Sequence, residues 1–513
     1  MAFLAAQSFS AAHNGGHWVF ALDDSYIHLA MARTLAAHGT WGIEPGIFAA
    51  ASSAPLYTLL LAAAFLTGWV STFWAWLFAA AGGVVVAWLL TDRLQTYFPR
   101  PGIAIGLGLA AAVIIWLPEL IATGMEPTLH IVAILCVAMC LERVLGNSSG
   151  SRRAGLQLVA AIGVAAALRF ETLFFVPPIV WFLWRTGRRQ LAAMAGLAGI
   201  LPALVLGLVQ VSNGAMFLPN SVLLKGVDLE QGLSGHMSRL LHVLAEPSQF
   251  ALLLAAALSL FESARREKKA ADTRRWTILM FIFVLCAHAA LARPDRRYLG
   301  YVLALGIWAL APVFGEWWRR AASFVRQAHE HPRPALSNLS LLFLVVVIWL
   351  PFADHFIDLG RLPRLGTDIY AQQFQMARFF NANYGGETVA LNDIGAAAWM
   401  GGVHVLDLRG LANDDVARLR LHQGSLSPDQ LQELARQAGV AVVAIYSHWF
   451  LREQGLPDSW QLVGRWQIPA EIQVNCASNT VDFLALSTGG VDRLNRTLHD
   501  FNSELPASVT LHQ

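Results

Sequence analysis

Residues 190–211 read QLAAMAGLAGILPALVLGLVQV, a stretch in which no side chain is charged. About 20 apolar residues in a helix are enough to cross the hydrocarbon core of a bilayer. Charged side chains are costly inside that core, so their absence over such a length is informative. The stretch therefore predicts a membrane-spanning helix.

Similar apolar runs recur on both sides of this stretch. The chain of 513 residues is 56% apolar and 14% charged, whereas soluble proteins carry about 25% charged residues. Because each span needs about 20 residues, we expect a polytopic α-helical membrane protein with about 10–11 transmembrane helices. The runs lie at 73–91, 101–118, 125–142, 155–168, 171–184, 190–211, 248–262, 276–292, 298–318 and 338–352.

Lysine and arginine are unevenly distributed between the loops that join these runs. One alternating set of loops holds most of them, for example at Arg152–Arg153 and Arg188–Arg189. Positively charged loops stay in the cytoplasm, so the other set, and the chain after about Pro351, should face the periplasm of a bacterial inner membrane. The run Pro55–Val70 then starts and ends outside, and we expect an interfacial helix there.

Two domains follow from these patterns. Residues 1–352 form the transmembrane module, with a first external loop at 23–54 and the interfacial helix at 55–70. Residues 353–513 have ordinary polarity and predict a soluble periplasmic α/β domain. Its expected strands are 387–391, 403–408, 440–446 and 481–486, and its expected helices are 372–384 and 428–437.

Two adjacent carboxylates, Asp23 and Asp24, precede a helical stretch in the first external loop. Such a pair can supply a general base, or Asp24 can help to bind a divalent cation such as Mg²⁺, Mn²⁺ or Ca²⁺. Aspartate is also a preferred helix N-cap, so a purely structural role is open at this point. The four cysteines and 16 histidines show no spacing typical of a disulfide framework or a metal site.

A second group of polar residues lies where the predicted spans meet the outer side. Long basic side chains there can simply reach toward lipid headgroups. The loop at 293–297 nevertheless holds three arginines on the side that is otherwise poor in basic residues, which favours a phosphate-bearing ligand. The group comprises Glu119, Glu126, Arg169, Glu171, Asn220, Lys225, Arg293, Asp295, Arg296 and Arg297.

Several stretches, in order along the chain, resemble the GT-C superfamily of glycosyltransferases, and most closely the mycobacterial cell-wall arabinofuranosyltransferases. The most extensive is DDSYIHLAMARTLAAHGTWGIEPGIFAAASSAPLYTLLLAA at 23–63. The others are TGMEPTLH at 123–130, FLPNSVLLKG at 217–226, RRYLGYV at 296–302 and VALNDIGAAAWMGGVHVLDLRGLAND at 389–414. Three positions depart from the family pattern: Ser25 replaces alanine, Phe170–Glu171 replaces Pro–Asp, and the aromatic after Asp393 is shifted to Trp399.

The resemblance implies an inverting transfer of a sugar, a pentofuranose such as arabinofuranose, from a polyprenyl-phosphate donor. The acceptor would be a glycan, a lipid-linked molecule or a protein, beside membrane lipid and without nucleic acid. It further implies a general base at Asp23 or Asp24. Donor-phosphate contacts would come from Lys225, Arg296, Arg297 and Arg169, and substrate contacts from Glu126, Asn220, Tyr298 and Asp393.

Two other functions are compatible with a membrane protein of this kind. A transporter or flippase of a lipid-linked sugar would show inverted repeats and charges near the bilayer midplane, and the sequence shows neither. A non-catalytic cell-envelope assembly protein is open if Asp23 and Asp24 only cap a helix.

Overall fold

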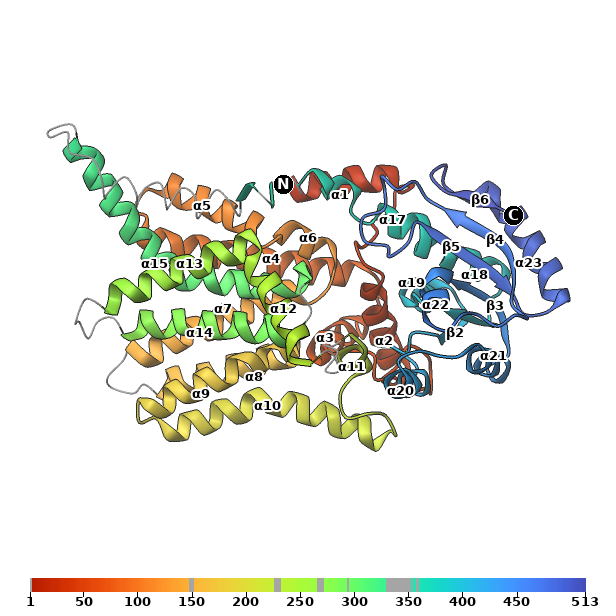
Figure 1. The fold of residues 1–513 in the computed structure, drawn as a ribbon, viewed down its shortest axis with the longest axis horizontal. Helices are drawn as coiled ribbons and strands as arrows, with labels where there is room; N and C mark the ends of the chain where they lie inside the picture. The colour runs from red at the N-terminus through yellow and green to blue at the C-terminus, as the bar shows by residue number, and fades with distance from the viewer. Residues whose placement is uncertain are drawn as a thin grey trace.

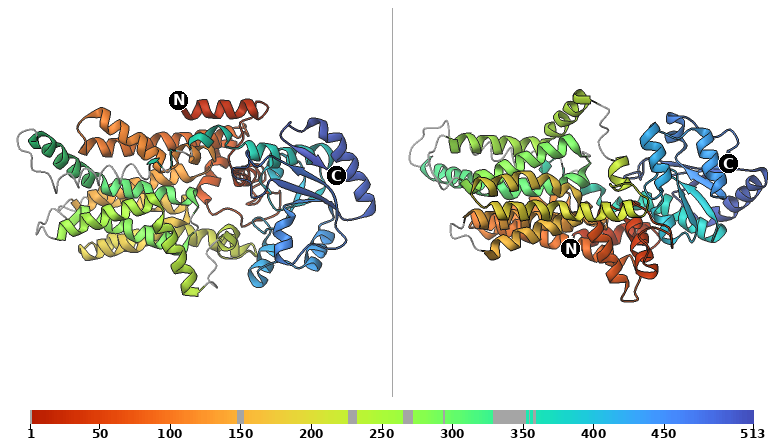
Figure 2. Two further views of the ribbon diagram at one scale, coloured as in Figure 1. Left: turned by 45° about the horizontal axis from the view of Figure 1, so that its top comes forward. Right: turned by 90° about the horizontal axis from the view of Figure 1, so that it is seen from below.

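The computed structural model describes residues 2–146, 152–225, 232–264, 272–292, 295–328, 352–353, 355–356 and 359–513. A bundle of long, roughly parallel helices occupies one half of the molecule, and a mixed α/β domain occupies the other (Figures 1 and 2). The short helix α1 (Ala2–His13) lies along the boundary between the two halves (Figure 1).

The bundle contains the helices that correspond to the predicted apolar runs. Most runs up to residue 318 fall on one helix each, but 101–118 is divided between Pro101–Ile114 and Leu117–Ala122, and 171–184 between Phe170–Phe175 and Val176–Arg185. Residues 338–351 lie outside the described part of the chain. Among the described residues, five helices are long and apolar enough to cross a membrane, or six if the pair bent by 87° near Pro247 counts as one span. The helices are α4 (Phe73–Tyr97), α5 (Pro101–Ile114), α6 (Leu117–Ala122), α7 (Pro127–Gly146), α8 (Arg152–Leu168), η1 (Phe170–Phe175), α9 (Val176–Arg185), α10 (Arg189–Ser212), α11 (Asn220–Lys225), α12 (Gly232–Ala245), α13 (Pro247–Ala264), α14 (Asp272–Leu291) and α15 (Arg296–Ala328).

Burial distinguishes the lipid-facing helices from the central one. In α10, 28% of the most apolar segment is buried inside the protein, whereas in α15 the buried share of that segment is 89%. Leu197, Ile200 and Leu208 are more than half exposed on α10, a surface that suits hydrocarbon and not water. The apolar helix α3 (Pro55–Phe65) has 11 residues, and at about 1.5 Å per residue it is too short to cross.

The α/β domain is built on one six-stranded sheet with the order β2-β1-β3-β5-β4-β6. Strands β2, β1 and β3 run parallel, and β5, β4 and β6 join them antiparallel. Sequence patterns predicted four of the strands and missed β4 and β6. The strands are β1 (Thr388–Leu391), β2 (His404–Asp407), β3 (Val440–Ile445), β4 (Gln461–Gln467), β5 (Thr480–Ala485) and β6 (Thr510–His512).

Helices of this domain cover the sheet. The predicted helix 372–384 corresponds to η5 followed by α18, and the predicted helix 428–437 coincides with α21. The domain's helices are η4 (Leu359–Arg364), α17 (Thr367–Ile369), η5 (Tyr370–Phe374), α18 (Gln375–Asn383), α19 (Gly395–Met400), α20 (Asp414–Gln423), α21 (Pro428–Gln437), α22 (Ser447–Glu453), α23 (Thr488–Phe501) and η6 (Asn502–Glu504).

Helix α2 (Asp24–His38) joins the two halves because it is buried on both sides. Tyr26 and Leu29 pack into the core of the bundle, while Ile27 and Met31 pack into the core beneath the sheet. Because α2 is apolar on two faces, it lacks the single polar face that is typical of a helix on a protein surface. The α/β domain therefore packs directly against the segment at 23–54.

Asp23 and Arg33 hold the two ends of the short helix α19. The Asp23 carboxylate accepts hydrogen bonds from the backbone N–H groups of Gly395 (2.6 Å) and Ala396 (2.8 Å). The Arg33 guanidinium donates to the carbonyl oxygens of Trp399 (2.5 Å) and Ala398 (2.9 Å). Each charge thus meets the helix end of opposite partial charge. Asp23 makes no capping hydrogen bond to its own helix α2, so the N-cap interpretation is wrong for α2: the helix it caps is α19.

We predict that Gly395→Ala loosens this docking. A Cβ atom at Gly395 would lie 2.0 Å from the backbone oxygen of Asp23, so the two halves must move apart. We expect a loss of roughly 1–3 kcal/mol in unfolding free energy, together with faster proteolysis between the halves. Gly489→Ala is the matched control, because a Cβ there meets nothing within 4 Å. Equal stability of the two variants in detergent would contradict the prediction.

Candidate active site

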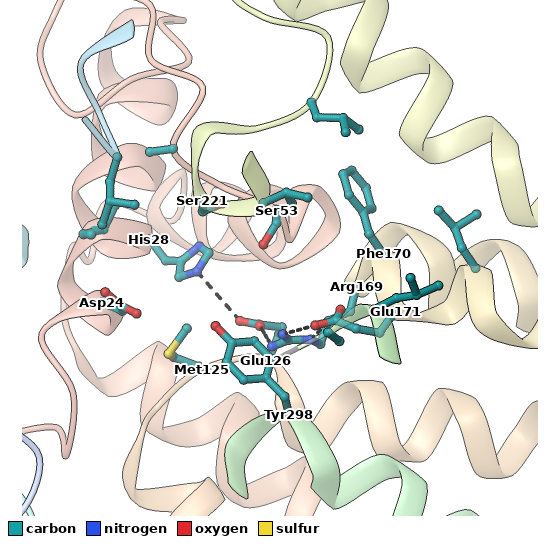
Figure 3. Close-up of a pocket in the computed structure, with 18 of the residues that line it drawn as sticks. Asp24, His28, Ser53, Met125, Glu126, Arg169, Phe170, Glu171, Ser221 and Tyr298 are labelled. Atoms are coloured by element: carbon teal, nitrogen blue, oxygen red, sulfur yellow. Dashed lines mark hydrogen bonds and ion pairs between the residues drawn. The ribbon is translucent and has the colours of Figure 1, made fainter. Parts of the chain in front are cut away.

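A cavity of about 290 Å³ opens where the bundle meets the α/β domain (Figure 3). Its wall combines α2, the start of α7, η1, α11 and the residues around the start of α15, and Leu411 contributes from the α/β domain. The polar residues of the wall are Asp24, His28, Ser53, Glu126, Arg169, Glu171, Ser221 and Tyr298.

Arg169 is the centre of a buried charge network in this cavity. Its guanidinium donates to Glu126 (Nη1 to Oε1, 2.5 Å) and forms a two-point contact with Glu171 (2.6 and 3.1 Å). It also lies 4.8 Å from the centre of the Tyr298 ring. Buried charges are tolerated when they are paired in this way. Two carboxylates already offset Arg169, so the arrangement suits positioning of Glu126 better than capture of a phosphate.

Glu126 retains one oxygen for a ligand. Its Oε2 atom is buried and has no hydrogen-bond partner within the described part of the chain. His28 and Arg169 approach Glu126 from opposite sides (Figure 3), with 3.8 Å between His28 Nε2 and Glu126 Oε2. The other ring nitrogen of His28 lies 3.3 Å from the Thr58 hydroxyl and 3.4 Å from the Ser52 hydroxyl. A substrate hydroxyl could therefore be recognised by the carboxylate and the imidazole together.

Sequence reasoning missed His28, although the signal was present. His28 follows Asp24 by four residues, and residues at this spacing share one face of a helix. Both side chains line the cavity.

The two adjacent aspartates point to different places. Asp24 lines the cavity, and its Oδ2 lies 3.0 Å from Nη1 of Arg297, which in turn lies 4.8 Å from the Tyr298 ring centre. Asp23 is turned toward α19, and Asp393, beside it, accepts a hydrogen bond from Gln373 (2.9 Å). Asp23 and Asp393 thus belong to the domain junction and lie outside the cavity wall.

The remaining predicted residues fall in three settings. Asn220 is fully buried and donates to Asp414 of α20 (2.6 Å), so it anchors α11, whose Ser221 and Val222 line the cavity. Lys225 is the last residue of α11, and its side chain is not among the described ones. Arg296 lines a second cavity of about 490 Å³, and Arg297 borders that cavity as well.

The predicted divalent cation at Asp24 stays a prediction. Within the described ranges, no group of three or more His, Cys, Asp or Glu side chains is placed to hold a metal ion. The Asp24 carboxylate contacts the Arg297 guanidinium.

The pair formed by Asp23 and Asp393 predicts a pH-dependent stability. Burial raises the pKa of Asp23 to about 7, the Asp393 charge adds to the rise, and the two α19 N–H donors oppose it. Burial also raises the pKa of Asp393. A raised carboxyl pKa means that the folded state binds the proton more tightly, so stability should fall as pH rises from about 4 to 7. Thermal unfolding should show this slope in the wild type and a flatter one in Asp23→Asn. An unchanged slope in the variant would exclude Asp23 as its source.

Comparisons with known proteins agree with this architecture. Residues 367–484 match the model of a domain of unknown function, DUF8728, and no curated protein matches the chain in sequence. The crystal structure of ArnT from Cupriavidus metallidurans bound to undecaprenyl phosphate is similar at 14% identity and a TM-score of 0.52, over 95% of this chain and 98% of that one.

The archaeal oligosaccharyltransferase AglB from Archaeoglobus fulgidus, in complex with an inhibitory peptide and a dolichol-phosphate, is also similar. It shares 10% identity and a TM-score of 0.51, over 98% of this chain and 78% of that one. At such identities the likeness establishes the fold. The chain is a multi-pass membrane protein that shares the overall fold of ArnT and AglB and carries a C-terminal α/β domain.

Proposed function

We propose that this protein is a glycosyltransferase that moves a sugar from a polyprenyl-phosphate carrier to an acceptor, with inversion at the anomeric carbon. One observation carries the proposal: Asp24, Glu126 and His28 line a single cavity at the end of a transmembrane bundle. The similar folds of ArnT and AglB, which were solved with undecaprenyl phosphate and dolichol-phosphate, support the class of donor.

The lining of the cavity suits a lipid-linked sugar. One part of its wall is apolar, with Phe170, Leu173, Phe174, Leu218 and Leu291, and would accommodate the first isoprenoid units. The polar part contains His28 and the Glu126 oxygen that has no hydrogen-bond partner among the described residues. Buried carboxylate oxygens need donors, and sugar hydroxyls supply them.

We assign the general base to Asp24. It would accept the proton of the acceptor hydroxyl while that oxygen forms its bond to the anomeric carbon and the carbon–phosphate oxygen bond breaks. Arg297, which the family resemblance assigns to the donor, would stabilise the departing phosphate through its guanidinium. Arg169 would hold Glu126 in place, and Lys225 remains a candidate contact for the phosphate.

The finer assignments rest on the family resemblance. A pentofuranose such as arabinofuranose is the sugar we propose, and the α/β domain would face the periplasm of a bacterial inner membrane. The acceptor would be a glycan, a lipid-linked molecule or a protein.

We predict that Asp24→Asn lowers turnover per folded molecule by roughly 10²–10⁴. The assay incubates the purified protein with synthetic polyprenyl-phosphate sugars and an acceptor extract, and measures released polyprenyl phosphate. Asp23→Asn is the matched control, because its carboxylate contacts α19. It should lose about 1 kcal/mol of stability while keeping turnover within a few-fold. Full activity of Asp24→Asn would refute the assignment of the base.

We further predict that Arg297→Lys weakens use of the donor by roughly tenfold in kcat/KM. Lysine keeps the positive charge but loses the planar fork that can contact Asp24 and a phosphate together. The exposed Arg496→Lys of α23 is the control and should match the wild type. If Arg297→Lys retains wild-type kcat/KM, the phosphate contact lies elsewhere.

A further inference from the structure

Five arginines gather at the end of the bundle opposite to the α/β domain, where α8 begins, α9 ends and α10 begins (Figure 1). We call them the arginine cluster, and they are Arg152, Arg153, Arg185, Arg188 and Arg189. Helix α10 packs against both α8 and α9. A Cβ atom added at Gly155 of α8 would lie 3.2 Å from the Leu191 side chain of α10, so the first turns of α8 and α10 lie side by side.

The protein itself provides little negative charge to offset this cluster. Helices α8, α9 and α10 contain no aspartate or glutamate, and every cluster member except Arg188 is exposed. Among the residues that the structure describes, these exposed arginines form no ion pair. On the neighbouring α7, Glu142 is already paired with Arg93 (2.7 Å). The start of α14, which packs against α9, adds one acid and two bases, Asp272, Arg274 and Arg275.

An exposed apolar surface adjoins the cluster on each of the three helices. Side chains at a spacing of 4, 8 or 11 residues lie toward the same face of a helix. At this spacing from an arginine, and further into the bundle, lie exposed apolar side chains: Leu156 after Arg152, Trp181 before Arg185, and Leu197 and Ile200 after Arg189. At about 1.5 Å per residue, Ile200 lies roughly 16 Å below Arg189, within the hydrocarbon layer.

The charges of the cluster are held at the level where lipid headgroups lie. The Arg189 guanidinium lies 5.2 Å from the centre of the Trp184 ring, and Trp184 is 56% exposed. Exposed tryptophans are typical of the boundary between hydrocarbon and headgroups. An orientation signal needs positive charge in the loops but no fixed arrangement of that charge. Here the packing of α8 against α10 and the contact of Arg189 with Trp184 bring the charges together.

We propose that the arginine cluster binds an anionic phospholipid with two phosphate groups, and that its acyl chains lie along the exposed faces of α8, α9 and α10. Basic pockets between transmembrane helices bind headgroups of this kind. Two phosphates match the cluster better than one, because five guanidiniums from three helices surround the site and a single phosphodiester carries one negative charge. This inference does not depend on the proposed glycosyltransferase function.

The position of the cluster connects it to the first cavity through one hairpin. Helix α8 ends at Leu168, next to Arg169, and α9 begins directly after η1. The tip of this hairpin thus contributes Arg169 and Glu171 to the cavity, and its base carries the arginine cluster. A lipid bound there would hold α8, α9 and α10 together at the end that the α/β domain does not contact.

The test titrates three lipids into the delipidated full chain in a neutral detergent: tetraoleoyl cardiolipin, dioleoyl phosphatidylglycerol and dioleoyl phosphatidylcholine. Native mass spectrometry measures binding, and the midpoint of thermal unfolding is recorded beside it. We expect cardiolipin to bind at least roughly tenfold more tightly than phosphatidylcholine, with phosphatidylglycerol between them, because each phosphate adds charge-assisted contacts. The midpoint should rise with cardiolipin concentration, since a ligand of the folded state stabilises that state.

A double variant, Arg152→Gln with Arg189→Gln, removes one guanidinium each from α8 and α10. It should bind cardiolipin roughly tenfold more weakly than the wild type. The matched control is Arg100→Gln with Arg319→Gln, which removes the same charge from exposed positions outside the cluster, in the same positively charged set of loops. The control should bind as the wild type does. Without lipid, both double variants should unfold at the wild-type midpoint, because all four positions are exposed.

Three results would overturn the proposal. One is equal binding of the three lipids by the wild type, which needs no variant. Another is an equal loss of cardiolipin binding, or no loss, in the two double variants, because the effect would then depend on total charge and not on the cluster. The third concerns inorganic pyrophosphate, which has the charges but no acyl chains and should displace cardiolipin only at far higher concentration. Displacement at a concentration similar to that of cardiolipin would identify a site for a soluble phosphate.

Discussion

The contact between the Asp23 carboxylate and the first two N–H groups of α19 determines how the two halves of this protein are arranged. It joins the start of α2 to the α/β domain over 372 residues of sequence. Arg33 completes the contact at the other end of α19. Gly395 allows it, because any side chain there would collide with the backbone of Asp23. Burial of α2 between two cores then makes the junction a continuous packed interface.

Around this junction, charges alternate in a chain that links the two cavities. Glu126 contacts Arg169, the Tyr298 ring lies between Arg169 and Arg297, and Arg297 contacts Asp24. Each guanidinium has a carboxylate partner, so the network can be buried without a large net charge. When a phosphate enters, it would compete with Asp24 for Arg297, and this competition would free the carboxylate to take up a proton.

Much of the fold could be predicted from the sequence, because a segment inside the lipid bilayer must be almost free of charged side chains. Uncharged runs such as residues 190–211 are visible without any structure, and the strands β1 and β3 stand out as short apolar runs. Strand β4 was missed because Gly464 and Arg465 interrupt its apolar pattern. The adjacent pair Asp23 and Asp24 could be singled out, but their opposite directions depend on where α19 lies, which is a tertiary contact. His28 was missed although its spacing of four residues from Asp24 is visible in the sequence.

Asp23 and Asp24 are joined by one peptide unit, but their side chains contact different parts of the molecule. Asp23 contacts the α/β domain and Asp24 lines the cavity. A movement of the domain would therefore act on the backbone next to Asp24. A tilt of the domain against the bundle would move Asp23, and only one planar peptide unit with its flanking backbone torsions separates Asp23 from Asp24. A ligand bound to the α/β domain away from the cavity would thereby influence where the Asp24 carboxylate lies.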